Sequence, residues 1–440
     1  MKISKIQKFG GTSVGSALRM KNVAELINDG ETKIIVLSAM SGTTNALVEI
    51  AKHTAKQDIS KVNEILNELK QKYSQVISEL YETPEYIEKS THYVDSVFTC
   101  LKEITKKPHS ITNEKEILAQ GELLSTHLFT FYLQEKNVDC QLISALDFMH
   151  IDIHGEPVFS KIETDLTKIL NQFPQQKLFI TQGFICLNHH SQIDNLQRGG
   201  SDYTASIIGA TVHADEIQIW TDIDGMHNND PRLVENTKPV RNLHFEEAAE
   251  LAYFGAKILH PTCILPAKEK NINVRLLNTM DPKAEGTTIS NEVLHSGIVA
   301  IAAKDGITSI KIKSGRMLLA YGFLRKVFQI FEDFQTPIDL ITTSEVGVSV
   351  TIDNNKHLNE IKQKLEEFGT VFVEENMTII CVVGQIPSDT IGIQSKVLQA
   401  FQDIPIRMVS YGGSNHNISF IVRAEDKIKA LQTLHNTLFI

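Results

Sequence analysis

A lysine followed by two adjacent glycines stands near the start of the chain. The run from Lys8 to Gly15 reads K-F-G-G-T-S-V-G and follows an alternating, strand-like segment. Gly10 and Gly11 lack side chains, so a phosphate could approach the backbone N–H groups there, and a helix N-terminus behind them would favour an anion. Lys8 could place a compact positive charge on phosphoryl oxygens. The pattern is neither a P-loop nor G-x-G-x-x-G, so it indicates phosphate binding or simply a tight strand–helix turn.

Four other polar residues could bind a small polar ligand, three of them near predicted strand ends or helix starts and one within a predicted helix. In R-G-G-S-D, the Arg198 guanidinium suits a carboxylate, and Asp202 starts a predicted helix. Alternatively, Asp202 only caps that helix and Arg198 is solvated. Thr44 lies in S-A-M-S-G-T-T-N after a predicted strand and could bond a carboxylate or cap a helix. Glu122, in an apolar helix, could bind an ammonium group or be an ordinary paired carboxylate. These types together suit recognition of an amino acid.

A third group of residues suits a nucleotide. Thr221 and Asp222, in W-T-D after a predicted strand, could hold a ribose, and Arg232, in D-P-R, could hold phosphate. Lys257, in F-G-A-K-I-L-H-P, could supply a second cation or be a surface lysine after a helix-ending glycine.

The composition excludes several functional classes. The 440 residues carry a net charge of −10, so no basic surface indicates binding to nucleic acid or anionic lipid. No signal peptide or membrane-spanning stretch is evident, and five cysteines without a C-x-x-C pair favour reduced thiols in a cytoplasmic protein. His150 and His154 have metal-like spacing but lie in an alternating run, so we expect no metal site in the protein itself.

The elements that must position these groups alternate between strand and helix up to about residue 290. Buried strands are predicted at Lys33–Ala39, Leu178–Cys186, Glu216–Thr221 and Asn273–Leu277, and a helix at Ser13–Asn28. This alternation predicts an α/β layered domain with a largely parallel sheet. The stretch 51–107 is charged and helical with no strand signal. A turn-rich break at residues 282–287 marks the end of this region.

The remainder of the chain contains an internal repeat. The pattern K-V-F-Q-x-F-x-D at 326–333 recurs as K-V-L-Q-x-F-x-D at 396–403. Two further pairs of segments agree at matching spacing, so we predict two homologous units, each reading strand, helix, strand, strand, helix.

Taken together, the motifs closely resemble those of the aspartokinases, in the amino-acid kinase superfamily. K-F-G-G-T-S-V, R-G-G-S-D-Y-T-A, W-T-D…D-P-R and F-G-A-K-x-L-H-P occur in the family's order over essentially the whole chain. The resemblance implies a three-layer α/β/α sandwich over 1–290, followed by two ferredoxin-like ACT domains over 291–440. It also implies that a first ACT unit, about 307–372, is inserted into a second, formed by about 295–305 and 373–440.

The resemblance also implies roles for individual residues. Lys8 would be the phosphate-binding catalytic lysine, and Asp202 would orient it. The residues that would bind the amino-acid substrate are Thr44, Glu122, Arg198 and Ser201. The residues that would bind the nucleotide are Lys8, Gly10, Gly11, Thr221, Asp222, His227, Arg232 and Lys257.

In the first ACT unit, several residues resemble those of lysine-inhibited members: Met317, Phe323, Leu324, Asp339, Ser344 and Glu345. Asp339 would meet the ammonium group of an effector, L-lysine by this resemblance. Because ACT units commonly pair side by side, at least a homodimer is implied.

The implied reaction is phosphoryl transfer from ATP, with Mg²⁺, to the side-chain carboxylate of L-aspartate. A carboxylate is already ionised at neutral pH, so no general base is required. The alternatives are a kinase for another carboxylate, such as acetylglutamate, and a catalytically inactive amino-acid sensor. A nicotinamide dehydrogenase is disfavoured because G-x-G-x-x-G is missing.

Overall fold

A computed structural model describes residues 2–196, 199–255, 260–315, 321–387 and 389–440, and two units can be distinguished in it. The first unit comprises Met1–Met226, Arg241–Phe245 and Ile258–Glu292, and the second His227–Val240, Glu246–Lys257 and Val293–Ile440. The segments 227–240 and 246–257 thus belong to the second unit. The division therefore differs from the expected single domain boundary near residue 290. Within the described residues, no helix is both long and apolar enough to cross a membrane.

An eight-stranded sheet forms the centre of the first unit, in the order β3-β4-β2-β1-β7-β9-β10-β8. Neighbours from β3 to β9 are parallel, and β10 runs antiparallel to β9. The strands are β1 (Lys5–Phe9), β2 (Lys33–Leu37), β3 (Gln141–Leu142), β4 (Leu178–Gln182), β7 (Glu216–Thr221), β8 (Asn242–His244), β9 (Asn273–Asn278) and β10 (Thr287–Ser290).

Two details of this sheet correct the expectations from sequence. The strand predicted over Leu178–Cys186 is interrupted, because Phe184 has a φ of 67° and turns the chain. After this turn, β5 (Ile185–Leu187) and β6 (Ile193–Asn195) form a separate antiparallel pair. The turn-rich stretch at 282–287 connects β9 to β10 within the first sheet, so the first unit continues beyond it.

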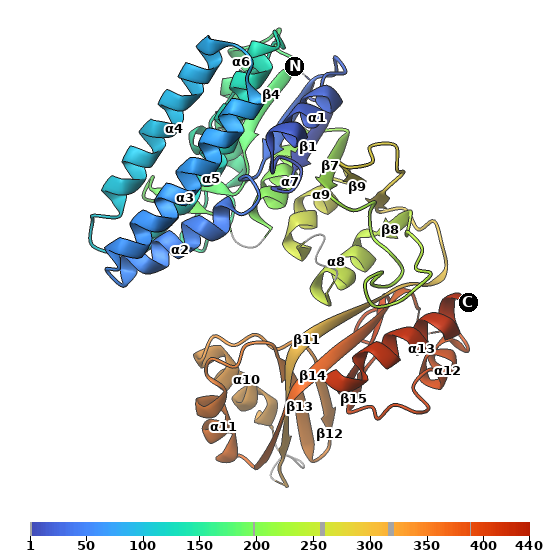
Figure 1. The fold of residues 1–440 in the computed structure, drawn as a ribbon. Helices are drawn as coiled ribbons and strands as arrows, with labels where there is room; N and C mark the ends of the chain where they lie inside the picture. The colour runs from blue at the N-terminus through green and yellow to red at the C-terminus, as the bar shows by residue number, and fades with distance from the viewer. Residues whose placement is uncertain (1, 197–198, 256–259, 316–320, 388) are drawn as a thin grey trace. The chain divides into compact units, whose positions relative to one another are not determined.

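Helices cover both faces of the sheet, so the first unit has three layers (Figure 1). Side chains alternate across a strand; Phe9, Ile35 and Ile180 join a core with the helices of one face. On the other face, a Cβ on Gly209 of α7 would lie 3.5 Å from Ile6. The helices of the first face are α1 (Ala17–Ile27), α2 (Thr43–Ala55), α3 (Ile59–Leu80), α4 (Pro84–Ile104) and α5 (Ile111–Glu135). The opposite layer contains α6 (Phe159–Asn171), α7 (Gly200–Val212) and α9 (Leu265–Glu269), and short 3-10 turns are η1 (Ala145–Asp147) and η2 (Pro261–Ile264).

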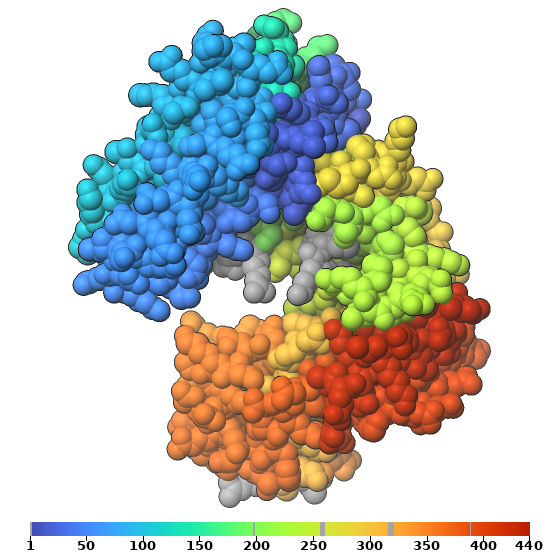
Figure 2. Space-filling model, in the orientation of Figure 1, coloured from blue at the N-terminus to red at the C-terminus, as the bar shows by residue number. Residues whose placement is uncertain are grey.

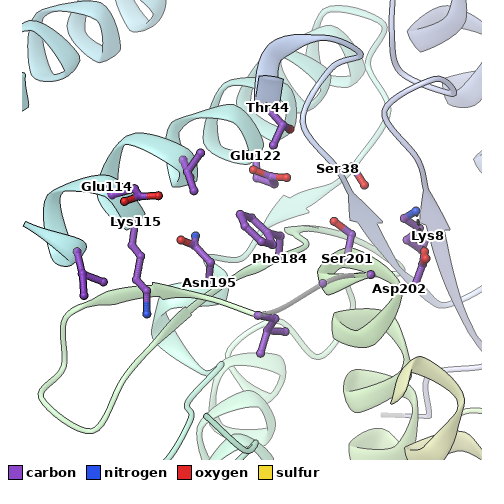
Figure 3. Close-up of a pocket in the computed structure, with 15 residues that line it drawn as sticks. Lys8, Ser38, Thr44, Glu114, Lys115, Glu122, Phe184, Asn195, Ser201 and Asp202 are labelled. Carbon is purple, nitrogen blue, oxygen red and sulfur yellow. Dashed lines mark ion pairs between the residues drawn. The ribbon is translucent and has the colours of Figure 1, made fainter. Parts of the chain in front are cut away.

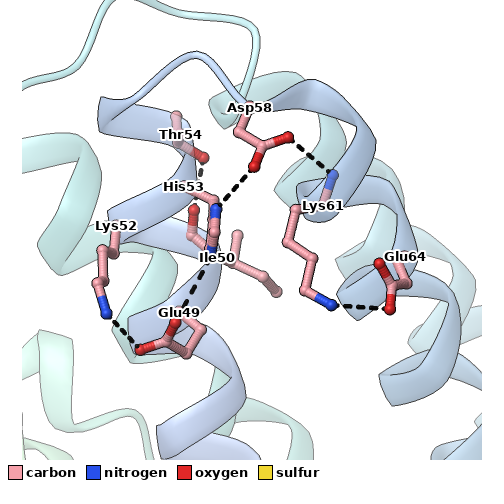
Figure 4. Close-up of polar contacts among 8 residues, drawn as sticks. All are labelled: Glu49, Ile50, Lys52, His53, Thr54, Asp58, Lys61 and Glu64. Carbon is pink, nitrogen blue, oxygen red and sulfur yellow. Dashed lines mark hydrogen bonds and ion pairs between the residues drawn. The ribbon is translucent and has the colours of Figure 1, made fainter.

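The charged stretch after residue 51 is helical, as predicted, and its helices α3 and α4 pack against α2 and α5. Figure 2 shows them as a contiguous blue surface. Polar contacts fix the sharp connection between α2 and α3 (Figure 4). Asp58 caps α3 by accepting a hydrogen bond from the backbone N–H of Lys61 at 3.2 Å, and its other oxygen lies 3.1 Å from Nδ1 of His53. This corner holds α3 against α2, which carries Thr44 at its first turn.

The second unit is built on a six-stranded antiparallel sheet in the order β12-β13-β11-β14-β16-β15. The first half of β11 pairs with the second half of β14, next to β16, whereas its second half pairs with the first half of β14 and with β13. The strands are β11 (Gly297–Lys313), β12 (Ile341–Ser344), β13 (Gly347–Ile352), β14 (Thr370–Gln385), β15 (Met408–Ser410) and β16 (Asn417–Arg423). Each half of the sheet therefore has four strands in the ferredoxin-like order.

Each half of this sheet has its own core and its own pair of helices. One core joins α10 and α11 to β11 and β13, and the other joins α12 and α13 to β14 and β16. The helices of the second unit are α8 (Phe245–Tyr253), α10 (Phe323–Asp333), α11 (Leu358–Glu366), α12 (Ile393–Gln399) and α13 (Lys427–Phe439), with the 3-10 turn η3 (Ala424–Asp426). The two segments of the sequence repeat beginning at 326 and 396 fall on α10 and α12.

Candidate active site

Lys8 projects from β1 toward the start of α7. It shares the strand face of Ile6, which packs on that helix. The Lys8 ammonium lies 2.7 Å from Oδ1 of Asp202, in the first turn of α7, and the two side chains are only 10% and 13% exposed. The N–H groups of the first turn of a helix such as α7 also favour an anion. A positive charge and helix N–H groups are thus held together at the end of the central strand.

The two glycines permit a close approach of backbone segments. A Cβ on Gly11 would lie 2.7 Å from the carbonyl oxygen of Ala39, and Gly11 itself accepts a hydrogen bond from the Ser41 N–H at 3.0 Å. The helix expected directly behind the glycines begins only at Ala17, because the N–H groups of residues 13 and 14 turn back to the Gly10 carbonyl. The helix N-terminus beside Lys8 is that of α7. The predicted helix start at Ser13 was wrong, because α1 begins at Ala17, and anion binding at the start of α1 stays a prediction.

Glu122 is a buried carboxyl group on α5 with an unused oxygen. Glu122 is only 3% exposed, and its Oε1 accepts a hydrogen bond from the Ala39 N–H at 3.1 Å. Oε2 has no hydrogen-bond partner among the residues that the structure describes. Burial raises the pKa of Glu122 to about 8, although the Ala39 N–H and the Lys8 charge oppose the shift. A cation reaching Oε2 would relieve this cost.

A cavity of about 580 Å³ brings several predicted residues together (Figure 3). This volume lies in the range of small-molecule sites. Lys8, Thr44, Glu122, Ser201 and Asp202 all line it. The other residues that line it are Ser38, Ile111, Glu114, Lys115, Leu118, Phe184, Asn195, Leu196, Gly199 and Gly200. Arg198 lies outside the described residues.

Sequence reasoning missed four charged, polar or aromatic residues of this cavity: Phe184, Asn195, Lys115 and its neighbour Glu114. Phe184 lines the cavity because its backbone is in the left-handed region, and the glycine before it in Q-G-F was the available signal for a turn. Asn195 stands three residues before Arg198, in Q-I-D-N-L-Q-R-G-G, and this proximity to the carboxylate-binding motif was its available signal. Lys115 precedes Glu122 by seven residues on α5, so the helical repeat would have placed both on one face.

The predicted nucleotide residues are divided between the two units. Thr221 ends β7 in the first unit, where its hydroxyl accepts a hydrogen bond from the Ile223 N–H at 3.3 Å, and the next residue, Asp222, is exposed. His227 and Arg232 belong to the second unit. Lys257 lies outside the described residues.

Arg232 is already paired with a neighbouring carboxylate. Its Nε and Nη2 donate to the two oxygens of Asp230 at 2.9 and 2.7 Å. His227 lies 3.1 Å, through Nδ1, from the Thr237 hydroxyl. A phosphate bound by Arg232 would have to share or replace this bidentate pairing.

Asp339, the predicted effector residue, is buried in a polar cluster of the second unit. Its side chain is 2% exposed. Oδ1 accepts from the Lys304 ammonium at 2.7 Å and from the Tyr253 hydroxyl of α8 at 2.9 Å. Oδ2 has no hydrogen-bond partner among the described residues, so one oxygen is left for a further donor.

The other predicted effector residues that the structure describes lie at the start of α10 and at the end of β12. Phe323 and Leu324 begin α10; Phe323 belongs to the core, whereas Leu324 is 37% exposed. Ser344 ends β12, and Glu345 follows it in the exposed turn to β13. Met317 lies outside the described residues.

The histidines with metal-like spacing serve local contacts. His150 lies 3.0 Å, through Nε2, from Oδ2 of Asp165 on α6, and His154 is exposed in a turn. In the described part of the chain, no group of three or more His, Cys, Asp and Glu side chains is arranged to hold a metal ion.

Comparison with known proteins assigns the chain to a family. Residues 4–278 match the model of the amino acid kinase family, and residues 380–438 match an ACT domain. The lysine-sensitive aspartokinase 3 of Escherichia coli is 33% identical over 452 residues, which cover 99% of both chains. The chloroplastic aspartokinase 1 of Arabidopsis thaliana is 34% identical over 99% of this chain and 80% of its own length.

Solved structures agree with this assignment. The crystal structure of E. coli aspartokinase III in complex with aspartate and ADP superposes with a TM-score of 0.88, at 32% identity over 99% of this chain and 100% of that one. The same enzyme in complex with lysine and aspartate gives a TM-score of 0.81 over the same shares of the two chains. This chain therefore belongs to the amino acid kinase family and, within it, to the aspartokinases.

Proposed function

We propose that this chain transfers the γ-phosphoryl group of MgATP to the side-chain carboxylate of L-aspartate, giving ADP and 4-phospho-L-aspartate. The observation that carries this proposal is the pairing of Lys8 with Asp202 at the start of α7, in the same cavity as buried Glu122. This reaction is the first step in making lysine, threonine and methionine. The complex of the E. coli relative with aspartate and ADP supports it.

The chemistry requires charge neutralisation more than proton transfer. The attacking carboxylate of aspartate, whose pKa is near ~3.9 in the free amino acid side chain, is ionised at neutral pH. One of its oxygens forms a bond to the γ-phosphorus while the bond from that phosphorus to the β,γ-bridging oxygen breaks, and ADP leaves. Lys8 and the N–H groups of α7 would neutralise charge on the γ-phosphate oxygens, and Asp202 would keep the Lys8 ammonium in place.

Recognition of the acceptor needs groups for an ammonium and for two carboxylates. We assign the ammonium to Glu122, whose Oε2 has no partner among the described residues. Thr44 and Ser201, from the first turns of α2 and α7, would donate hydroxyl hydrogen bonds to carboxylate oxygens. Arg198 would pair with the α-carboxylate. An N-acetylated acceptor has no ammonium, so this site favours aspartate over acetylglutamate.

For the nucleotide, we assign Gly10 and Gly11 to the triphosphate side and Thr221 and Asp222 to the nucleoside side. His227, Arg232 and Lys257 are proposed to complete this site, and Mg²⁺ to enter bound to ATP. The parallel pairing of β1 with β7 supports the assignment of Gly10, Gly11, Thr221 and Asp222, since parallel strands present their carboxyl ends at one edge of a sheet.

We further propose inhibition by L-lysine, bound by the residue set around Asp339 with Phe323, Leu324, Ser344, Glu345 and Met317. Oδ2 of Asp339, which has no hydrogen-bond partner within the described ranges, would accept from the effector ammonium. The complex of the E. coli relative with lysine and aspartate supports this proposal. We assign residues 1–290 to catalysis and 291–440 to regulation, with 307–372 as the inserted ACT unit.

Pairing of ACT units would make the protein a homodimer or larger. The four residues of β12 are all exposed, which supports an association over this strand. We place the protein in the cytoplasm, where its five cysteines, all present as free thiols, would stay reduced.

The direct test is trapping of the acyl phosphate by hydroxylamine, with L-aspartate and MgATP as substrates. Lys8→Ala should lower kcat at least about a hundredfold. Lys5→Ala is the matched control, because Lys5 lies on the same strand and its ammonium forms a partly exposed ion pair with Glu31. No hydroxamate from the unaltered protein, or a normal kcat for Lys8→Ala, would refute the proposal.

A further inference from the structure

The cavity contains a polar side chain that no contact explains. Asn195 lines it, and both the oxygen and the nitrogen of its amide are buried without a hydrogen-bond partner among the described residues. A primary amide offers two donor hydrogens and an acceptor oxygen. Leaving such a group buried and unpaired costs stability, so in a native fold it indicates a ligand or a bound water.

The backbone of Asn195 is held firmly in place. It ends β6, where it pairs with Ile185 of β5. Its N–H donates to Oδ1 of Asp194 at 2.7 Å, and this carboxylate also forms an ion pair with Lys115 of α5. The Asp194 side chain is 9% exposed, so the ion pair is well shielded from water. The hairpin carrying the amide is thereby tied to the helix that carries Glu122.

The amide lies away from the phosphoryl-transfer end of the cavity. Figure 3 shows Lys8 and Asp202 at one end, and Asn195 beyond Phe184, toward Lys115. Glu122 projects into the space between these ends. An amino acid with its side-chain carboxylate at Lys8 would therefore present its α-carbon groups toward Glu122 and Asn195.

We propose that the Asn195 amide binds the α-ammonium and α-carboxylate groups of the acceptor, and that the Lys115–Asp194 ion pair positions it. The amide oxygen accepts from the ammonium, and the amide nitrogen donates to the carboxylate, so one planar group reads both. This inference rests on the proposed function and deepens it, because it makes Asn195 a determinant of specificity for a free α-amino acid.

The first test compares steady-state kinetics of Asn195→Ala with the unaltered protein. A hydrogen bond to a charged group is worth ~1.5–3 kcal/mol, so KM for L-aspartate should rise about ten- to hundredfold. The KM for ATP and kcat should change less than about threefold, because the amide is remote from Lys8. Gln192→Ala is the matched control: it lies in the same hairpin, is exposed, and contacts Asn188 only through its backbone.

The second test removes the partner groups from the ligand. Succinate lacks the ammonium of aspartate, and β-alanine lacks its α-carboxylate; both can be measured as competitive inhibitors. The Asn195→Ala substitution should weaken each analogue clearly less than it weakens L-aspartate. Equal loss for all three ligands would overturn the assignment, because it would mean that the amide shapes the cavity without reading these groups.

Thermal unfolding separates binding from a structural role. Since the amide has no partner in the described protein, Asn195→Ala should keep the Tm or raise it. A lowered Tm with unchanged KM would overturn the proposal. If Asn195→Ala does not fold, Asn195→Asp serves instead, and its added carboxylate should raise KM for L-aspartate further. An unaltered protein that does not phosphorylate L-aspartate rejects the proposed function itself; an active protein whose Asn195→Ala variant has a normal KM rejects only the role of Asn195.

Discussion

Glu122 should make the binding of L-aspartate depend on pH between 6 and 8. Burial raises the pKa of this carboxyl group to about 8, so at pH 7 about nine-tenths of the unliganded protein carries it protonated. The ammonium group of aspartate binds the ionised form. Binding at lower pH must therefore remove a proton first, and each pH unit below the pKa costs about 1.4 kcal/mol.

The expected change in affinity follows from this linkage. The apparent Kd scales as 1 + 10^(pKa − pH), which falls about fiftyfold between pH 6 and pH 8 for a pKa of about 8. A pKa one unit lower would still give about a tenfold change. The aspartate ammonium stays protonated throughout this range. Affinity should thus increase with pH, which is opposite to the behaviour of a site that binds through a histidinium ion.

Isothermal titration calorimetry in buffers of different ionisation enthalpy measures both quantities. At pH 7, binding should release about nine-tenths of a proton, and at pH 9 almost none. Glu122→Gln is the matched control: it keeps the shape and the hydrogen bond from Ala39, but it should bind weakly at every pH and release no proton. A flat Kd between pH 6 and 8 with no proton release would refute Glu122 as the ammonium partner.

Three further substitutions test other parts of the structure. Asp202→Asn removes the charge that holds Lys8 at 2.7 Å, so kcat should fall at least about tenfold with little change in Tm; an unaltered kcat would contradict the positioning role. Gly11→Ala puts a Cβ 2.7 Å from a backbone oxygen and should lower the free energy of unfolding by about 1–3 kcal/mol in urea titrations, whereas Gly413→Ala, with open space around it, should not. Asp339→Asn should raise the lysine concentration for half-inhibition about tenfold or more while leaving uninhibited activity intact; unchanged inhibition would remove Asp339 from the effector site.

Local signals were sufficient where short-range sequence rules decide the structure. The strands starting at Lys33, Glu216 and Asn273 begin at the predicted residues, because runs of buried apolar residues are typical of strands covered on both sides. The repeat in the C-terminal third predicted the two halves of the second sheet. Both predictions rest on the periodicity of residue types, which neighbouring residues in the sequence show directly.

Other features were not predicted correctly, because they depend on turn geometry and on contacts with residues distant in the sequence. Phe184 interrupts a run that is apolar enough for one strand, since its positive φ depends on the geometry of the following hairpin. The start of α1 at Ala17 follows from carbonyl contacts of Gly10. The segment 227–240 groups with the second unit through contacts such as the hydrogen bond from Asn229 to the Leu431 carbonyl at 3.1 Å.

The sequence alone determined which residues are candidates for the chemistry: a lysine before two glycines, an arginine–glycine–glycine–serine–aspartate run, and an acidic residue in an apolar helix. Only the tertiary structure decided their environment. Glu122 has a raised pKa because folding removes it from water. Lys304 and Tyr253 both donate to one oxygen of Asp339, and its other oxygen has no partner in the part of the chain that the structure describes. Asn195 likewise became a candidate substrate-binding residue because folding buries its amide without a hydrogen-bond partner among the described residues. Desolvation and the satisfaction of hydrogen bonds depend on groups far apart in the chain, so neither can be found in the local pattern.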